Sequence, residues 1–122
     1  MARILIVEDE QSYCDSLAII LSRAGHEVRI ARSSDRGIRE GIAHCPDLLI
    51  SDWMLKNDLH GGDVAEQIRA ACPRAKIIVI SGYMDVVRQV EESYGFVSEV
   101  IQKPFHATEI LEVAERVLAR ED

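Results

Sequence analysis

Five side chains that could bind a metal ion and a phosphate group stand at the ends of short apolar runs. They are Glu8, Asp9, Asp52, Ser81 and Lys103. Carboxylates without histidine or cysteine among them suit a hard cation such as Mg²⁺ or Mn²⁺, which completes its shell with water and phosphate oxygens. A lysine ammonium group and a serine hydroxyl are further donors to phosphate. The set therefore points to phosphoryl chemistry at a magnesium site.

Three converging carboxylates need a positive partner. Two unit charges ~4 Å apart repel by roughly 4 kcal/mol at an effective dielectric constant near 20. A phosphoryl group on Asp52 would be neutralised by the metal ion on one oxygen, by Lys103 on another and by the Ser81 hydroxyl on a third. Taken singly, such residues are more often solvated loop acids, helix caps or surface lysines. The interpretation rests on their occurrence together at the ends of four different apolar runs.

The elements that must position these side chains follow from an alternation of apolar runs with amphipathic stretches. The runs predict strands at residues 4–7, 27–31, 48–52, 76–80 and 97–102. Helical spacing predicts helices at about 12–24, after the cap candidates at 33–35, at 64–71, at 83–94 and through 110–118. Such alternation implies a doubly wound parallel α/β sheet, in one domain over residues 1–122. The carboxyl ends of its strands share one edge, where ligands bind.

The composition is that of a globular domain with an aliphatic core. The chain has 122 residues, 48% of them hydrophobic, and a formal net charge of −7. An acidic surface repels phosphate backbones, so we expect this chain to bind neither nucleic acid nor anionic membranes directly. The first ten residues form neither a secretory signal nor a membrane span. We therefore expect a cytoplasmic protein.

The three cysteines, Cys14, Cys45 and Cys72, lie far apart and lack CxxC spacing. This number and spacing fit neither a disulfide framework nor a zinc site. We therefore expect reduced thiols, as is usual in a cytosolic protein. Cys14 and Cys72 fall within helical patterns, which favours small packing residues over reactive ones.

Four segments carry a resemblance to a known family. They are ILIVEDE at 4–10, DLLISDWML at 47–55, IVISG at 78–82 and KPF at 103–105. Their order and separations resemble the receiver domain of two-component response regulators along the whole chain. The resemblance implies a flavodoxin-like sheet with strand order 2-1-3-4-5 and five helices. It also implies an acceptor aspartate that takes a phosphoryl group from a sensor histidine kinase or a histidine phosphotransfer protein.

The resemblance implies a role for each acidic residue. Asp52 would be the phosphoacceptor. Asp9 and Asp52 would ligate Mg²⁺ (or Mn²⁺), and Glu8 would act directly or through a water molecule. The backbone carbonyl of Met54, two residues after the acceptor, would be the third protein ligand.

The resemblance also covers the switch residues, although the chain departs from the family pattern at some positions. Ser81 would be the hydroxyl that moves toward the phosphate, Lys103 would bind the phosphate, and the bond from Lys103 to Pro104 would be cis, as is common in the family. The family usually has an aromatic residue where this chain has Val100, so the output would depend on loop and helix shifts, or on Tyr83 or Tyr94. The loop through 56–62 lacks the common proline.

The implied function is a switch in which phosphorylation shifts a two-state equilibrium. We expect no enzymatic activity beyond the chain's own phosphorylation and dephosphorylation. The expected partners are a downstream effector protein or domain, and possible second copies, at the face formed by the fourth helix, the fifth strand and the fifth helix. Whether this chain stands alone or is the N-terminal part of a longer protein with an effector domain stays open.

Two alternatives remain beside this interpretation. One is a receiver-like interaction module that works without phosphorylation, which the valine at position 100 favours slightly. The other is a phosphohydrolase with an aspartyl-phosphate intermediate, which usually carries a second aspartate where this chain has Met54. A flavodoxin-type cofactor carrier is disfavoured because no phosphate-binding loop rich in Gly, Ser or Thr follows the first strand.

Overall fold

The computed structural model describes residues 1–55, 60–82, 90 and 92–120. Its strands are β1 Arg3–Val7, β2 Glu27–Ala31, β3 Leu48–Asp52, β4 Lys76–Ser81 and β5 Glu99–Gln102. Its helices are α1 Gln11–Arg23, α2 Ser34–His44, α3 Gly61–Ala71 and α5 Ala107–Ala119. Among these residues, no helix is long and apolar enough to cross a membrane.

The five strands form one parallel sheet in the order β2-β1-β3-β4-β5. The predicted fold class and strand order are therefore confirmed. The structure describes four of the five predicted helices, because most of the expected helix at 83–94 lies outside the described residues. The fifth strand begins at Glu99 rather than Val97, since the Val97 N–H donates to the Tyr94 carbonyl in a preceding turn (3.0 Å).

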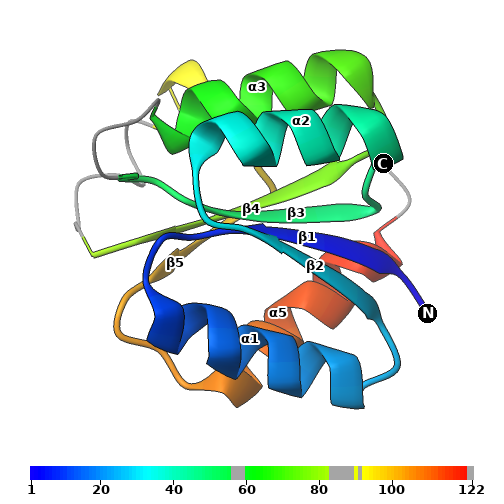
Figure 1. Cartoon of the computed structure of the whole chain (residues 1–122), viewed down its shortest axis with the longest axis vertical. Helices are drawn as coiled ribbons and strands as arrows, with labels where there is room; N and C mark the ends of the chain where they lie inside the picture. Colours follow the sequence, from blue (N-terminus) through cyan, green and yellow to red (C-terminus); the bar gives the residue numbers. More distant parts are fainter. Residues whose placement is uncertain (56–59, 83–89, 91, 121–122) are drawn as a thin grey trace.

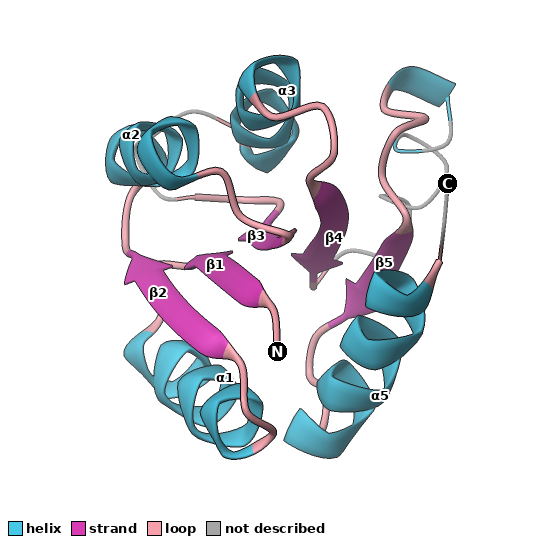
Figure 2. Ribbon diagram, turned by 90° about the vertical axis from the view of Figure 1, so that its right-hand side faces the viewer, coloured by secondary structure: helices cyan, strands magenta, loops and turns pink. Residues whose placement is uncertain are grey.

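The sheet is covered on both faces, α2 and α3 lying on one and α1 and α5 on the other (Figures 1 and 2). Alternation along the strands divides the aliphatic core between these two layers. Leu5 and Leu49 pack on the side of α3, whereas Ile4, Leu48 and Ile50 pack with the apolar residues of α1 and α5. All five residues of β3 are buried, because this strand is central. The strand that ends at Asp52 is thus enclosed on both faces of the sheet.

Glycine lets α2 lie close to its neighbours. A Cβ on Gly37 would stand 2.7 Å from Val7 Cγ2, and one on Gly41 would stand 2.6 Å from Ile68 Cδ1. The helix begins after Ser33, whose hydroxyl accepts a hydrogen bond from the Arg36 N–H (3.2 Å), as the cap candidates predicted.

The expectation that all three thiols are reduced is wrong in this structure. Cys45 and Cys72 form a disulfide, and Cys14 is a free, buried cysteine. Cys45 caps the C-terminus of α2 and Cys72 that of α3, and the packing of these helices brings the two Cα atoms to 5.6 Å. That separation lies within the usual range for a disulfide. Spacing in the sequence carried no sign of it, because the proximity arises from tertiary packing.

Candidate functional site

The predicted site residues lie at the carboxyl ends of the strands, on one edge of the sheet. Glu8 and Asp9 follow β1, Asp52 ends β3, and Ser81 ends β4. Lys103 follows β5, and its backbone N–H donates to the Ser81 carbonyl (2.7 Å). The sheet therefore brings together residues from four strands, as the alternating pattern predicted.

Three carboxylates converge at this edge. Glu8, Asp9 and Asp52 each offer one oxygen, and these oxygens lie within 4.8 Å of one another. Glu8 is fully buried and Asp52 is 5% exposed. Among the described residues, Glu8 Oε2 is a buried oxygen without a hydrogen-bond partner. Because an unpaired buried carboxylate oxygen is costly, this atom and the all-oxygen donor set fit a hard divalent cation.

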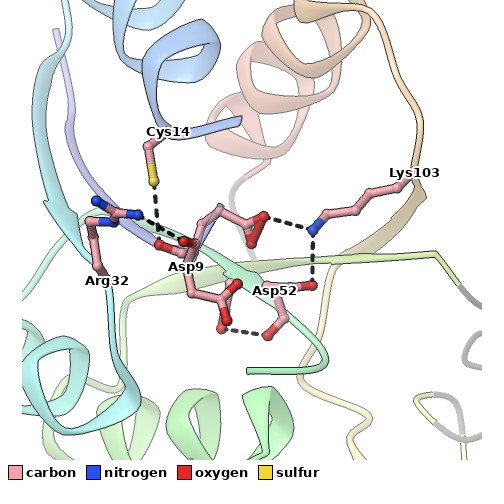
Figure 3. A network of polar contacts seen from close by, with 7 residues as sticks. Asp9, Cys14, Arg32, Asp52 and Lys103 are labelled. Carbon is pink, nitrogen blue, oxygen red and sulfur yellow. Dashed lines mark hydrogen bonds and ion pairs between the residues drawn. The ribbon is translucent and has the colours of Figure 1, made fainter. Parts of the chain in front are cut away.

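Lys103 places a positive charge beside the carboxylates of Glu8 and Asp52. Its Nζ lies 2.6 Å from Glu8 Oε1 and 3.4 Å from Asp52 Oδ1, and Figure 3 shows the side chain extending toward Asp52. The same nitrogen stands 4.5 Å from the centre of the Tyr13 ring, a cation–π contact. The bond from Lys103 to Pro104 is cis, as the family resemblance implied.

Burial and charge shift the acid–base properties of the site. Desolvation raises the pKa of Glu8 to about 8, and the neighbouring Asp52 carboxylate adds to this rise while the Lys103 hydrogen bond opposes it. Desolvation likewise raises the pKa of Asp52, against hydrogen bonds from Glu8 and the charge of Lys103. Burial acts to lower the pKa of Lys103, but its partners Glu8 and Asp52 outweigh that effect and raise it. The metal-free site thus retains protons near neutral pH.

We expect the metal-free protein to lose stability as the pH rises. The pKa of Glu8 is about 8 in the folded chain against 4.5 ordinarily, so the folded state binds more protons between these values. The free energy of unfolding should therefore fall from pH 5.5 to pH 8.5, by on the order of 2 kcal/mol. Urea unfolding in the presence of a chelator measures this change.

The matched control is Glu8→Gln, which has no proton to lose and should show a much flatter dependence. Mg²⁺ should stabilise the wild type more at pH 8.5 than at pH 5.5, because the ligand carboxylates must be deprotonated. If the free energy of unfolding depended on pH equally in the wild type and in Glu8→Gln, the raised pKa would not belong to Glu8.

Two further predicted residues flank the carboxylates. Ser81 is buried, 1% exposed, at the end of β4, which pairs with β3. The Met54 side chain is 52% exposed and lies two residues after Asp52. The roles of the Ser81 hydroxyl and the Met54 carbonyl stay predictions. Residues 56–59 of the loop that lacks the common proline lie outside the described residues.

A glycine that the sequence analysis did not single out lets the start of α3 lie against the end of β3. The Gly61 N–H donates to the Trp53 carbonyl (2.9 Å), so the chain returns to Asp52 where α3 begins. A Cβ on Gly61 would stand 1.9 Å from the Asp52 carbonyl oxygen, which excludes any other residue without movement of the backbone. The Gly-Gly pair that opens the helical pattern was the available sequence signal.

Two residues hold the backbone of the acidic pair in place. The Arg32 guanidinium donates to the Asp9 carbonyl (2.9 Å) and to Gln11 Oε1 (2.5 Å), and the Cys14 thiol donates to the Glu8 carbonyl (3.3 Å). Figure 3 shows Arg32 and Cys14 on the side of Asp9 away from Lys103. Arg32 directly follows β2. Its place at a strand end was the signal that could have identified it.

An aromatic cluster adjoins Asp52 in a chain that has Val100 where the family usually has an aromatic residue. The Trp53 ring lies edge-on to His60 (centroids 3.9 Å apart) and to Tyr94 (5.5 Å). Val100 packs against the same core cluster as Trp53. Of the two tyrosines considered as substitutes for the missing aromatic, Tyr94 therefore contacts the residue next to Asp52, whereas Tyr83 lies outside the described residues.

Residues 4–115 match the family described as the response regulator receiver domain. The chain belongs to this family. The resemblance seen in the sequence is thereby confirmed: this is a receiver domain of the two-component response regulators. The acidic cluster described above occupies the strand ends of this receiver domain.

Relatives and solved structures agree with this membership. This receiver domain is 31% identical over 116 residues to the nitrogen assimilation regulatory protein NtrX of Azorhizobium caulinodans, covering 94% of this chain and 26% of that protein. It is 26% identical over 118 residues to the cell cycle transcriptional regulator CtrA of Caulobacter vibrioides, covering 97% and 51%. The chain thus spans about a quarter to a half of these relatives.

Isolated receiver domains cover the chain almost end to end. The receiver domain of NtrX from Brucella abortus has a TM-score of 0.84 at 33% identity, covering 94% of this chain and 97% of that one. A CheY-like receiver domain protein from Methanospirillum hungatei has a TM-score of 0.87 at 28% identity, covering 97% and 94%.

Proposed function

We propose that this receiver domain is a phosphoacceptor in which Asp52 takes a phosphoryl group at a magnesium-dependent site. The observation that carries the proposal is the buried Glu8 Oε2, which has no hydrogen-bond partner in the described part of the chain and lies within a cluster of three carboxylates, beside the ammonium group of Lys103. A structural ion pair alone would not leave a third carboxylate at the cluster and a carboxylate oxygen unsatisfied. Membership of the response regulator receiver domain family supports the same conclusion.

The chemistry follows from the positions of the groups. A carboxylate oxygen of Asp52 attacks the phosphorus, while the bond to the donor's nitrogen or oxygen breaks and its electron pair leaves with that atom. Lys103 Nζ, 3.4 Å from Asp52 Oδ1, is placed to neutralise a phosphoryl oxygen on the new bond. Bound Mg²⁺ (or Mn²⁺) would be held by Glu8, Asp9, Asp52 and the Met54 carbonyl, and would screen the carboxylates from the incoming anion. Ser81 would then bind the phosphoryl group.

The proposed output is a shift between two conformations of this receiver domain. Its partners would be a sensor histidine kinase or histidine phosphotransfer protein, and a downstream effector or a second copy. The proposed face includes β5 and α5, where exposed Arg116 pairs with Glu99 (2.7 Å), and the helix expected from the sequence at 83–94, most of whose residues lie outside the described part of the chain. We further propose a cytoplasmic protein that binds no nucleic acid through this chain and acts on no substrate beyond its own phosphoryl group.

The test is incubation with Mg²⁺ and acetyl phosphate, followed by intact mass measurement. We expect one added phosphoryl group per chain, mapped by fragmentation to the peptide that contains Asp52, and no adduct when a chelator is present. Incubation with a panel of sensor kinases tests a second class of phosphoryl donor. If no donor yields an adduct, the domain is an interaction module that works without phosphorylation.

Replacing Lys103 by methionine is expected to have opposite effects on metal binding and on phosphorylation. Loss of the ammonium group 2.6 Å from Glu8 leaves the carboxylates more negative, so Mg²⁺ should bind roughly tenfold more tightly. Phosphoryl uptake should slow by about 100-fold, because the negative charge on the transferred phosphoryl group is no longer stabilised by the ammonium group. The fluorescence of Trp53, the only tryptophan and 3% exposed beside Asp52, reports the metal titration.

Arg23→Met is the matched control, since it removes an exposed cation of α1 and should change neither quantity. Weaker Mg²⁺ binding in Lys103→Met would contradict the electrostatic argument.

A further inference from the structure

The disulfide between Cys45 and Cys72 joins one exposed residue to one buried residue. Cys45 is exposed, whereas Cys72 is 4% exposed. The bond links the C-termini of α2 and α3, on the right in Figure 1, at the edge of the sheet opposite to Asp52. A hollow of about 400 Å³ lies against both cysteines, and its other lining residues are Pro46, Asp47, Ala71, Pro73, Arg74 and Ala75. A small molecule can therefore reach Cys45 from solvent while the chain stays folded.

This difference in exposure decides which sulfur atom a thiolate can attack. In thiol–disulfide exchange the thiolate bonds to one sulfur and expels the other, so the rate depends on access to the sulfur that is attacked. Attack on Sγ of exposed Cys45 expels Sγ of Cys72. The opposite attack requires an approach to Cys72, which is buried. The fold therefore directs a nucleophile to Cys45.

The backbone at Cys45 is held in an unfavourable conformation. Its φ is +30°, and it is the one residue other than glycine with a positive φ in the described part of the chain. It also precedes Pro46, and a residue before proline normally favours extended backbone. The disulfide holds its side chain, and Arg3 Nη2 donates to its carbonyl (2.8 Å). Opening the bond removes one of these two constraints and lets the backbone relax, which favours the open form.

The third cysteine lacks this access. Cys14 is fully buried in α1, and its thiol donates to the Glu8 carbonyl (3.3 Å). It lies outside the hollow that adjoins the disulfide. Cys14 therefore serves as an internal reference for a cysteine that external thiols do not reach in the folded chain.

We propose that this disulfide is a redox-modification site, at which a low-molecular-weight thiol such as glutathione forms a mixed disulfide with Cys45. Disulfides in a reducing compartment are usually transient or redox-sensing. The supply of such a thiol rests on the proposed cytoplasmic location, whereas exchange at Cys45 rests on its exposure and on the hollow beside it. The modification removes the covalent link between α2 and α3.

The exchange proceeds in two steps. The thiolate sulfur attacks Cys45 Sγ, the bond to Cys72 Sγ breaks, and its electron pair leaves with Cys72 Sγ, which takes up a proton from water. A second thiolate then attacks the sulfur of the small thiol in the mixed disulfide, and Cys45 leaves as a thiolate that is protonated in turn. Two small thiols are thereby oxidised to their disulfide, and the protein disulfide is reduced by two electrons. The same steps in reverse, begun by oxidised glutathione, restore the bond.

The test is incubation of the oxidised wild type with reduced glutathione, followed by acid quenching and peptide mapping by mass spectrometry. Neither Mg²⁺ nor a phosphoryl donor is present, so the outcome is separate from that of the phosphorylation test. We expect glutathione on Cys45 in roughly tenfold excess over Cys72, and none on Cys14. The rate of opening should rise linearly with glutathione concentration. A rate that reaches a plateau, or equal adducts on Cys45 and Cys72, would mean that exchange requires unfolding and would overturn the proposal.

Two matched variants compare the two sulfur atoms one at a time. Cys72→Ala retains Cys45, and Cys45→Ala retains Cys72. Oxidised glutathione should modify the first variant roughly tenfold faster than the second in native buffer, and both at similar rates in concentrated urea. Equal rates in native buffer would contradict the role of exposure. Rapid alkylation of both cysteines in wild type purified without reductant would also overturn the proposal, because no bond would then be present to exchange.

Discussion

Asp52→Asn is expected to abolish the phosphoryl adduct and, at the same time, to make the metal-free protein more stable. The amide of asparagine has no carboxylate oxygen to attack phosphorus, so intact mass after acetyl phosphate treatment should show no addition. This is the largest functional effect we expect. Among the described residues, Asp52 is the one carboxylate that both ends the central strand and lies 3.4 Å from Lys103 Nζ.

The gain in stability has an electrostatic cause. Burial raises the pKa of Asp52, which means that its ionised form is unfavourable in the folded chain. An amide of the same size removes that charge, and Lys103 keeps its closer partner Glu8 at 2.6 Å. We expect the free energy of unfolding at pH 8 in chelator to rise on the order of 1 kcal/mol.

Asp15→Asn is the matched control for both measurements. Asp15 is an exposed acid of α1 that accepts a hydrogen bond from Gln11 (2.7 Å) and lies outside the carboxylate cluster. It should keep the adduct and leave the stability unchanged. A phosphoryl adduct on Asp52→Asn would move the acceptor to another residue, and a loss of stability in this variant would contradict the cost assigned to the buried charge.

Loss of the disulfide between Cys45 and Cys72 is expected to lower the free energy of unfolding by roughly 3 kcal/mol. The bond closes a loop over a sequence separation of 27 residues, and a cross-link over such a loop restricts the unfolded chain by about this amount. In a domain of this size the midpoint of thermal unfolding should fall on the order of 10 °C. Cys45→Ser is the variant of choice because Cys45 is exposed, whereas Cys72 is buried.

The control for this prediction is the reductant itself. Dithiothreitol should lower the midpoint of the wild type to that of Cys45→Ser and should leave the variant unchanged. Phosphoryl uptake should persist in both, because the disulfide caps α2 and α3 at the edge opposite to Asp52. A wild type that is indifferent to the reductant would show that the two thiols are not cross-linked in solution.

The sequence by itself determined the sheet and the edge at which the acidic residues meet. Runs such as 4–7 and 48–50 are apolar throughout because their strands are buried on both faces, and this local property is visible without a structure. The helical stretches between the runs make the strands parallel, which places the residues after each run on one edge. Glu8, Asp9, Asp52 and Lys103 could be grouped for that reason alone.

The tertiary structure decided every contact between elements distant in the chain. The disulfide depends on how closely α2 and α3 pack, the anchoring of Asp9 depends on Arg32 at the end of β2, and the contact of Tyr94 with Trp53 depends on where the chain lies before β5. One hollow at the opposite edge of the sheet is likewise lined by residues from α3, β4 and the end of α5, among them Arg69, Lys76 and Arg120. Such contacts depend on the distance and rotation between packed elements, which periodicity does not encode. The carboxylate cluster at Asp52 was therefore visible in the sequence, whereas side chains that hold its backbone in place, such as Arg32, were not.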